Sequence, residues 1–308
     1  MKLATVIATM DRPAYLERAI LSLSNSHVVP DEVIVVDDGR DPSTQEMVVE
    51  WTARWSAVRY LASGGCGTSA ARNLGAQAAA SNLLLITDDD CLVDEDCIGR
   101  VVETFEMDPE VQCVTGSVLP YGDGSGKVGV ALMLSRQRRQ WKGRTYPWGI
   151  GSSSNISFRR EAFLRIGGFD QELGPGTRHF AAEDLDLLYR VLKAGAKIVY
   201  QPEATIYHDQ WRSRSQARRR RADYARGIAA FLSKHIVVHR DSFALRMLLV
   251  RLWEDVPLLA LMGLSKRNLE LELVSLYQLW GLATGLWVAG RYYQGKRHAG
   301  DARVSVRT

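Results

Sequence analysis

Cysteine is scarce in this 308-residue chain, which contains four cysteines and no CxxC pair. Structural zinc sites and disulfide frameworks need closely spaced cysteines, so the spacing argues against both. Reduced thiols fit a cytoplasmic protein, with the inner face of the plasma membrane as an alternative location. A long apolar run is also lacking near the N-terminus, where Leu3 to Thr9 is cut off by Asp11-Arg12-Pro13. That run is too short for a signal-peptide core and is expected to form a buried strand.

Charge of one sign does not dominate the sequence. The formal net charge is +4, and no aromatic residues interleave with basic ones as they do in nucleic-acid modules, so no nucleic-acid partner is expected. The charges are nevertheless uneven, because acidic residues cluster at 88–96 and basic residues at 212–226. Local fields therefore matter more than the total charge.

Short apolar runs alternate with amphipathic stretches over the first two hundred residues. The runs expected to be strands cover residues 3–9, 33–36, 58–61, 83–87 and 111–118. Pro13 and Pro42 stand where helices can begin, because the first helical position needs no backbone N–H. Strands that alternate with helices predict an α/β fold with a central, mostly parallel sheet. We expect this domain to span residues 1–212 and a basic, apolar helical region to span 213–308.

Acidic residues follow two of the expected strands. Asp88, Asp89 and Asp90 end the fourth one, and three adjacent carboxylates repel one another unless a cation lies beside them. Mg²⁺ and Mn²⁺ prefer such oxygen ligands, whereas the alternative is a solvated acidic turn. Asp38, in Asp37-Asp38-Gly39, could accept a hydrogen bond from a ribose or a base, or could belong to a structural turn.

Three further candidates are weak when they are taken singly. Arg72 could contact a nucleotide or hold the aspartates in place, or could be an ordinary solvated arginine. Glu183 and Asp184 suit the first turn of a helix, where acids complement the dipole. Asp184 could instead be a general base that deprotonates an acceptor hydroxyl. His208 could be structural, or its imidazole could complete a metal site built from carboxylates.

Taken together and in order, these residues resemble the family 2 glycosyltransferases of the GT-A fold, from Val6 to about His208. The ordered pieces are Thr9-Met10-Asp11-Arg12-Pro13, Val36-Asp37-Asp38-Gly39, Ala71-Arg72-Asn73-Leu74-Gly75, Asp88-Asp89-Asp90, Ser154-Asn155-Ile156-Ser157-Phe158-Arg159-Arg160, Gly167-Gly168-Phe169-Asp170, Glu183-Asp184-Leu185-Asp186 and His208. Each piece is weak, but the ordered set is specific. The resemblance implies a Rossmann-like GT-A domain that binds a nucleotide sugar.

The resemblance also implies roles for single residues. The donor would be held by Thr9, Arg12, Asp38 and Arg72, with Asp38 facing the base, and by Asp88 and Asp89 at the ribose or sugar. The Mn²⁺ or Mg²⁺ ion would be held by Asp90, as the main ligand of a DxD motif, and by His208. Asn155 would lie near the donor sugar and the acceptor. Asp184 would be the catalytic base, with Glu183 beside it.

The reaction implied is single displacement with inversion at the anomeric carbon, in which the metal stabilises the departing diphosphate. We expect a UDP-sugar donor and an acceptor hydroxyl on a glycan, a glycolipid or a small molecule such as a secondary metabolite. Two departures from the family pattern stand out. Asp11 occupies a position that is uncharged in many members, and the QxxRW motif of processive synthases is absent. The second departure favours transfer of single sugars.

Two other functions remain open at this point. A sugar nucleotidyltransferase usually has a glycine-rich loop after its first strand, and Thr9–Pro13 contains no glycine. A catalytically inactive scaffold, bound to a membrane or a partner, would have no need for the aspartate cluster, Asp184 and His208.

The C-terminal region is basic and then apolar. Its arginine cluster comprises Arg212, Arg214, Arg218, Arg219, Arg220, Arg221 and Arg226. Arg212 or Arg214 could neutralise the donor diphosphate, and the others could meet anionic lipid or a phosphate-bearing acceptor, or form a solvated helix face. Leu273 to Gly290 carries no charge but is only moderately apolar. We expect peripheral membrane association through 213–297, or packing on the core or on a partner such as a second copy, rather than a membrane span.

Overall fold

The computed structural model of the chain describes residues 1–122, 132–209, 213–255, 261 and 269–305. They fall into two compact units. The first unit contains Met1–Gln171 and Asp184–Arg212, and the second contains Glu172–Glu183 and Ser213–Thr308. The expected domain boundary between residues 212 and 213 stays a prediction, and the segment Glu172–Glu183 groups with the C-terminal helices.

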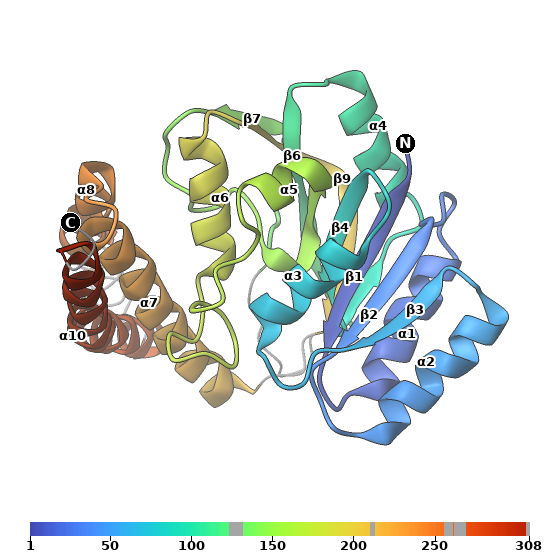
Figure 1. The fold of residues 1–308 in the computed structure, drawn as a ribbon, viewed down its shortest axis with the longest axis horizontal. Coiled ribbons are helices and arrows are strands. Elements are labelled where there is room, and N and C mark those ends of the chain that lie inside the picture. The colour runs from blue at the N-terminus through green and yellow to red at the C-terminus, as the bar shows by residue number, and fades with distance from the viewer. Residues whose placement is uncertain (123–131, 210–212, 256–260, 262–268, 306–308) are drawn as a thin grey trace. The chain divides into compact units, whose positions relative to one another are not determined.

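The first unit is an α/β layer structure (Figure 1). Its strands are β1 (Leu3–Thr9), β2 (Glu32–Asp37), β3 (Val58–Ala62), β4 (Leu83–Asp88), β5 (Cys91–Val93), β6 (Val111–Tyr121), β7 (Arg139–Lys142), β8 (Ile156–Arg159) and β9 (Lys197–Asp209). Its helices are α1 (Pro13–Ser24), α2 (Pro42–Arg54), α3 (Thr68–Ala78), α4 (Cys97–Met107), η1 (Ser153–Asn155), α5 (Arg160–Arg165) and α6 (Glu183–Lys193).

The described strands form one sheet in the order β3-β2-β1-β4-β8-β6-β9-β5, with β7 also paired to β9. Strands β3, β2, β1 and β4 are mutually parallel, and β6 is parallel to β9. Strand β8 runs antiparallel between β4 and β6, and β5 and β7 run antiparallel to β9. The prediction of an α/β fold with a central, mostly parallel sheet and a C-terminal helical region is confirmed, with antiparallel strands added in the second half.

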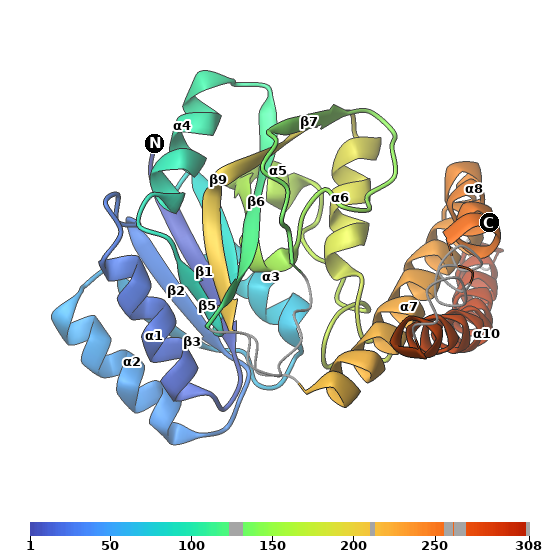
Figure 2. The same cartoon turned by 180° about the vertical axis from the view of Figure 1, so that it is seen from behind.

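Both faces of the sheet are buried, which explains why its strands read as continuous apolar runs. In β1, Leu3 and Ile7 point into one hydrophobic cluster, while Ala4 and Val6 point into another. Helices α1, α2 and α4 cover the first face, and α3, α5 and α6 cover the second (Figures 1 and 2). Successive strand residues alternate between these two layers of helices.

The helix starts follow from local chemistry. Pro13 and Pro42 are the first residues of α1 and α2, as the sequence predicts. Asp41 caps α2, because its side chain accepts a hydrogen bond from the backbone N–H of Ser43 at 3.0 Å. These starts place the loops after β1 and β2 at the carboxyl edge of the sheet, which is where ligands bind in open parallel sheets.

The second unit is helical, with α7 (Arg214–Val237), α8 (Ser242–Val250), η2 (Arg251–Asp255) and α10 (Leu269–Ser305). Helix α10 packs closely on α7, because Gly281 and Gly285 lie against the backbone and small side chains of α7. A side chain at either glycine would collide with Ala222 or Ala229. Among the helices that the structure describes, none combines the length and the hydropathy that a membrane crossing requires.

Glu172 ties the second unit together. Its carboxylate accepts hydrogen bonds from Tyr292 Oη at 2.8 Å, from Lys234 Nζ at 3.3 Å and from Lys296 Nζ. Partial burial raises the pKa of the carboxyl, but these three partners outweigh burial and lower the pKa to about 2. The segment before α6 is thereby linked to both α7 and α10.

Candidate functional site

The acidic turn lies at the carboxyl end of the parallel strands. Asp88 is the last residue of β4, and Asp89 and Asp90 form the turn that leads into β5. Strand β4 pairs with β1, whose last residue is Thr9. The side chains of Asp89 and Asp90 are buried, so their charges need partners within the fold. The sequence places these acids at a strand end, and the fold brings residues from other elements next to them. These partners are Thr9, Arg12, Arg72, Ser154 and His208.

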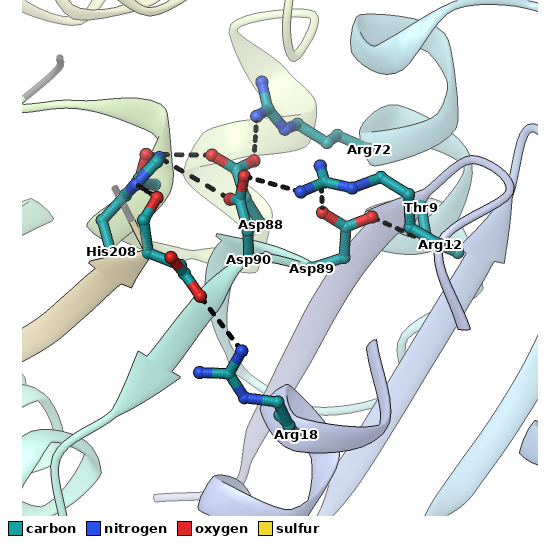
Figure 3. Close-up of polar contacts among 10 residues, drawn as sticks. Thr9, Arg12, Arg18, Arg72, Asp88, Asp89, Asp90 and His208 are labelled. Atoms are coloured by element: carbon teal, nitrogen blue, oxygen red, sulfur yellow. Dashed lines mark hydrogen bonds and ion pairs between the residues drawn. The ribbon is translucent and has the colours of Figure 1, made fainter. Parts of the chain in front are cut away.

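His208 is one of the groups brought to this turn. Strand β9 returns antiparallel to β5, so that His208 pairs with Cys91 across the sheet. The Nε2 atom of His208 lies 3.6 Å from Oδ1 of Asp90. Within the described part of the chain, Asp88, Asp90, Cys91 and His208 form a group whose potential ligand atoms all lie within 4.8 Å of one another. Figure 3 shows His208 and Arg12 approaching the carboxylates from opposite sides.

The hydrogen bond at the other ring nitrogen of His208 indicates its tautomer. Nδ1 lies 3.0 Å from the backbone carbonyl oxygen of Asp209. A carbonyl oxygen only accepts, so Nδ1 donates this hydrogen bond, and in the neutral tautomer that donates from Nδ1 the lone pair is on Nε2. Nε2 faces Asp90. This is the arrangement that metal-ligating histidines use, with the distal nitrogen fixed by a backbone carbonyl.

Arg12 bridges two of the three acids. Its guanidinium donates to Oδ1 of Asp89 at 2.9 Å and to Oδ2 of Asp90 at 3.0 Å, and Thr9 Oγ1 donates to Asp89 at 2.8 Å. Burial raises the pKa of Asp89 to about 7, with the charges of Asp90 and Asp88 adding to the effect and Arg12 and Thr9 opposing it. Arg12 is therefore a cation built into the acidic turn.

Asp88 is held by a different pair of residues. Arg72, buried on α3, donates to Oδ1 of Asp88, and Ser154 Oγ on η1 donates to Oδ2 at 2.9 Å. Burial acts to raise the pKa of Asp88, but the charge and hydrogen bond of Arg72 outweigh it and lower the pKa. The guanidinium of Arg72 also lies over the ring of Phe169, 5.3 Å from its centroid. Asp88 is thus an ionised carboxylate in a fixed orientation.

Asn73 explains why two separate sequence motifs belong together. Its Nδ2 donates to the backbone oxygen of Phe169 at 2.8 Å, and its Oδ1 accepts from the backbone N–H of Phe169 at 2.8 Å. The preceding Gly168 has φ +65°, and a Cβ there would lie 2.4 Å from the oxygen of Asn73. The asparagine therefore clamps Phe169 against α3, where its ring supports Arg72 and, through it, Asp88.

Two other predicted residues, Asp38 and Asn155, make hydrogen bonds to the backbone around them. The carboxylate of Asp38 accepts from Ser63 Oγ, from the backbone N–H of Cys66 and from that of Gly67. It therefore fixes the loop before α3, and its contact with a nucleotide base stays a prediction. Arg212 lies outside the described residues.

Asn155 is buried between β6 and β9. Its amide donates to the backbone oxygens of Ser117 at 2.9 Å and Ala204 at 2.8 Å. These two residues flank the point where the register between the strands shifts. The amide thereby satisfies carbonyls that the irregular pairing leaves over. A contact of Asn155 with donor or acceptor stays a prediction.

Glu183 and Asp184 begin α6 after a strained turn. Phe180 and Ala182 are non-glycine residues with positive φ, +65° and +75°. Such conformations cost about 1–3 kcal/mol each and are kept where the surrounding structure enforces them, often at functional sites. Helix α7 packs on this turn within the second unit, because Gly227 lies directly against the backbone of Ala181, the residue between Phe180 and Ala182. A catalytic role for Glu183 and Asp184 at this helix start stays a prediction.

Comparison with known proteins identifies the family. A family model described as "Glycosyl transferase family 2" matches residues 5–167, more than half of the chain. The chain is a family 2 glycosyltransferase. The matched residues contain Thr9, Arg12 and Arg72, as well as the acidic turn and Ser154, so most of the partners of the turn lie inside the family region.

Curated relatives of this glycosyltransferase are distant. It is 24% identical over 229 residues to the glucosyl-dolichyl phosphate glucuronosyltransferase of Haloferax volcanii, covering 70% of this chain and 72% of that protein. It is 28% identical over 239 residues to the pre-mycofactocin glycosyltransferase of Mycobacterium tuberculosis, covering 75% of this chain. This glycosyltransferase spans only 47% of the length of the mycobacterial protein.

A solved structure shows the same fold. The mannosyltransferase PcManGT from Pyrobaculum calidifontis, in complex with GDP-Man and Mn²⁺, superposes with a TM-score of 0.65 at 18% identity. The alignment covers 93% of this chain and 87% of that one. At this identity the likeness establishes the GT-A fold of this family 2 glycosyltransferase.

One basic residue beside the candidate site was missed by sequence reasoning. Arg18 of α1 donates to the carboxylate of Asp209 at 3.0 Å, directly after His208 (Figure 3). The guanidinium of Arg18 also lies over the ring of Tyr121, 5.2 Å from its centroid. A basic residue in the predicted helix that begins at Pro13, six positions after Arg12, was an available signal. Its acidic partner was not, because 191 residues separate the two.

Proposed function

We propose that this family 2 glycosyltransferase moves a sugar from a nucleoside-diphosphate donor, UDP-sugar in the first instance, to an acceptor hydroxyl with inversion. The observation that carries the proposal is the convergence of Asp88, Asp90 and His208 at the carboxyl edge of a parallel sheet, with Arg12 and Arg72 beside them. This edge is where open α/β sheets bind nucleotides. Cationic side chains beside the carboxylates suit a diphosphate bridged by a metal.

The ligand set fits Mn²⁺ or Mg²⁺. Two carboxylates and the Nε2 atom of an imidazole offer oxygen and nitrogen atoms, which these cations accept. Asp90 and His208 would hold the ion, and Asp88 would face the sugar or ribose together with Asp89. A divalent ion held there would offset the charge that develops on the leaving diphosphate. The Mn²⁺ in the Pyrobaculum mannosyltransferase supports this assignment.

Arg12 would exchange partners when the donor binds. In the ligand-free chain its guanidinium forms ion pairs with both Asp89 and Asp90. A metal that takes over Asp90 would weaken this pairing, and the guanidinium would be free to bind the donor phosphates from its place at the start of α1. Thr9, which donates to Asp89, would keep that carboxylate oriented toward the ribose.

Asp184 would act as the general base, with Glu183 beside it. Asp184 stands at the start of α6 and is only partly buried, so its carboxylate can meet an acceptor hydroxyl. Asp184 would take the proton from that hydroxyl as the oxygen attacks the anomeric carbon from the side opposite the leaving diphosphate. The strained turn before Glu183 supports a positioned, functional role for the pair.

The acceptor is proposed to be a glycan, a glycolipid or a small molecule. The names of the two curated relatives, a glucosyl-dolichyl phosphate glucuronosyltransferase and a pre-mycofactocin glycosyltransferase, support the second and third of these. Single-sugar transfer is favoured over processive synthesis, because the QxxRW motif is absent.

Thermal shift with nucleoside diphosphates tests the donor site. UDP and GDP are added with and without Mn²⁺ to the wild-type chain, to Asp90→Ala and to Glu46→Ala, which removes an exposed carboxylate from α2. A ligand at a hundred times its Kd stabilises the folded chain by about 2.7 kcal/mol. We expect an Mn²⁺-dependent rise in Tm with one nucleotide, retained in Glu46→Ala and lost in Asp90→Ala. No shift with any nucleoside diphosphate would refute the donor site.

The base assignment has its own test. Asp184→Asn should lower the rate of sugar transfer by about 10²–10⁴-fold, the usual contribution of a general base, while the nucleotide-induced Tm shift persists. Transfer at the wild-type rate in this variant would show that another group accepts the proton.

A further inference from the structure

Helix α10 has an exposed apolar face. Leu276, Trp280 and Trp287 follow one another at helical spacing, and their exposed fractions are 61%, 53% and 65%. Leu279 and Val288 flank them and are also exposed. Exposed tryptophans on one helix face are uncommon on a soluble surface, because each leaves a large apolar area in water.

The opposite face of the same helix is already buried. Leu282, Ala289 and Tyr293 are buried, and Leu282 packs with Ala225 and Ala229 of α7. A surface helix of a globular protein is normally apolar toward its core and polar toward water. The described part of α10 is apolar on both sides, so the fold accounts for one face and leaves the tryptophan face to be explained.

Each exposed tryptophan has an arginine beside it. The guanidinium carbon of Arg226 lies 4.1 Å from the ring centroid of Trp280, and that of Arg291 lies 5.3 Å from the centroid of Trp287. Indole rings prefer the boundary between headgroups and acyl chains of a bilayer, where one edge is apolar and the other wet. Guanidinium groups bind phosphate oxygens at the same depth.

The charge of the chain is divided between its two parts. Residues 213–308 contain 17 Lys and Arg against seven Asp and Glu, a formal net charge of +10. Residues 1–212 contain 22 against 28, a net charge of −6, and the two parts give the total of +4. The positive part is the part that carries the tryptophan face. Its charge favours an anionic surface and opposes a second, equally positive copy.

We propose that the tryptophan face of α10 rests on an anionic lipid bilayer, with the helix lying along the surface and the two indoles at headgroup depth. The described helices include none fit to cross a membrane, which agrees with an interfacial position. Arg291, beside Trp287, contacts lipid phosphates, and the basic residues of the region add long-range attraction. This inference goes beyond the sugar-transfer proposal and does not depend on it.

Flotation with lipid vesicles tests the surface directly. The full chain is mixed with vesicles of phosphatidylcholine alone and with vesicles containing phosphatidylglycerol, and the bound fraction is measured at low and high salt. We expect binding to the anionic vesicles that weakens with salt, because Debye screening shortens the reach of the basic region. The variant Trp280→Ser/Trp287→Ser should bind at least tenfold more weakly.

A matched control separates the tryptophan face from general surface hydrophobicity. Met107→Ser removes an exposed apolar side chain, 75% exposed, from α4 of the other unit and should bind as the wild type does. Equal binding by wild type and the double tryptophan variant, or no binding to anionic vesicles, overturns the proposal. A third result would also overturn it: sedimentation shows that the wild type is a dimer, the double variant is a monomer, and the wild type does not bind vesicles. The tryptophan face would then contact a second copy. The nucleotide-induced Tm shift should be the same in all these variants.

Discussion

A matched pair of glycines allows a sharp test of how closely α7 packs on the turn that contains Ala181. A Cβ at Gly227 of α7 would lie 2.5 Å from the oxygen, 2.6 Å from the carbonyl carbon and 2.9 Å from the Cα of Ala181. These are backbone atoms, which cannot rotate away. A Cβ at Gly290 of α10 would meet nothing within 4 Å. The two substitutions to alanine therefore differ in whether there is room for one methyl group.

The expected magnitudes have opposite signs. Alanine stabilises a helix interior by about 1 kcal/mol relative to glycine, and Gly290→Ala should show that gain. Gly227→Ala has the same intrinsic gain, but overpacking against backbone costs about 1–3 kcal/mol. The variants should thus differ by about 2 kcal/mol in the free energy of unfolding. Because Ala181 lies between the two strained residues before Glu183, the shift should also displace Asp184 and lower kcat by roughly tenfold or more.

The test measures thermal and urea unfolding of both variants, together with kcat for sugar transfer. We expect Gly290→Ala to melt higher than the wild type with unchanged kcat, and Gly227→Ala to melt lower with reduced kcat. If both variants were stabilised equally, α7 would not approach the turn as closely as described. If Gly227→Ala were destabilised but fully active, the turn would not position Asp184.

Three further predictions follow from contacts in the two units. Asn73→Ala leaves the backbone N–H and carbonyl of Phe169 without their side-chain partner and should lower the free energy of unfolding in urea by about 2–4 kcal/mol. The control Asn82→Ala, at an exposed position, should change the free energy of unfolding by less than about 0.5 kcal/mol. Equal values for the two variants would contradict the role of Asn73 in holding Phe169. Ser154→Ala removes a hydrogen bond to Asp88 and should weaken Mn²⁺-dependent nucleotide binding by about tenfold in calorimetry, and an unchanged Kd would show that Ser154 is dispensable. The pKa of Glu172 is lowered from 4.5 to about 2, so its ionised carboxylate stabilises the folded state above pH 4.5. This stabilisation is lost as the pH falls toward 2. The free energy of unfolding of Glu172→Gln, measured from melting curves, should therefore change less across that pH window than that of the wild type. We expect a difference of about 1 kcal/mol after allowance for solvent screening, and an equal pH dependence of the two proteins would contradict this.

The sheet was largely readable from the sequence, because its physics is local. Strand β1 begins and ends at the predicted residues, since Leu3–Thr9 is a continuous apolar run bounded by charge. Pro13 and Pro42 mark helix starts through the fixed φ of proline. The convergence of His208 on the acidic turn required more than local patterns, and the ordered family resemblance supplied it.

Other features depend on pairings that no local pattern reveals. The register between β6 and β9 shifts, and the buried amide of Asn155 donates hydrogen bonds to backbone oxygens at that point. No local sequence pattern reveals this contact. The segment Glu172–Glu183 groups with the helical unit because Glu172 meets residues of α7 and α10, far along the chain. The carboxylate of Asp38 accepts hydrogen bonds from the backbone of the loop before α3, a pairing that its own motif does not reveal.

The pairing of β5 with β9 has a consequence for the order of folding. Asp90 precedes β5, whereas His208 and Asp209 end β9, and the bond between Arg18 and Asp209 closes a loop of 191 residues. Closing long loops is entropically costly and slow, so we expect these contacts to form after the local βαβ units. A nascent chain whose last strand is still missing holds its three aspartates without their histidine. Binding of cation and nucleotide would then report completion of the whole sheet, and these ligands would selectively stabilise chains that have finished folding.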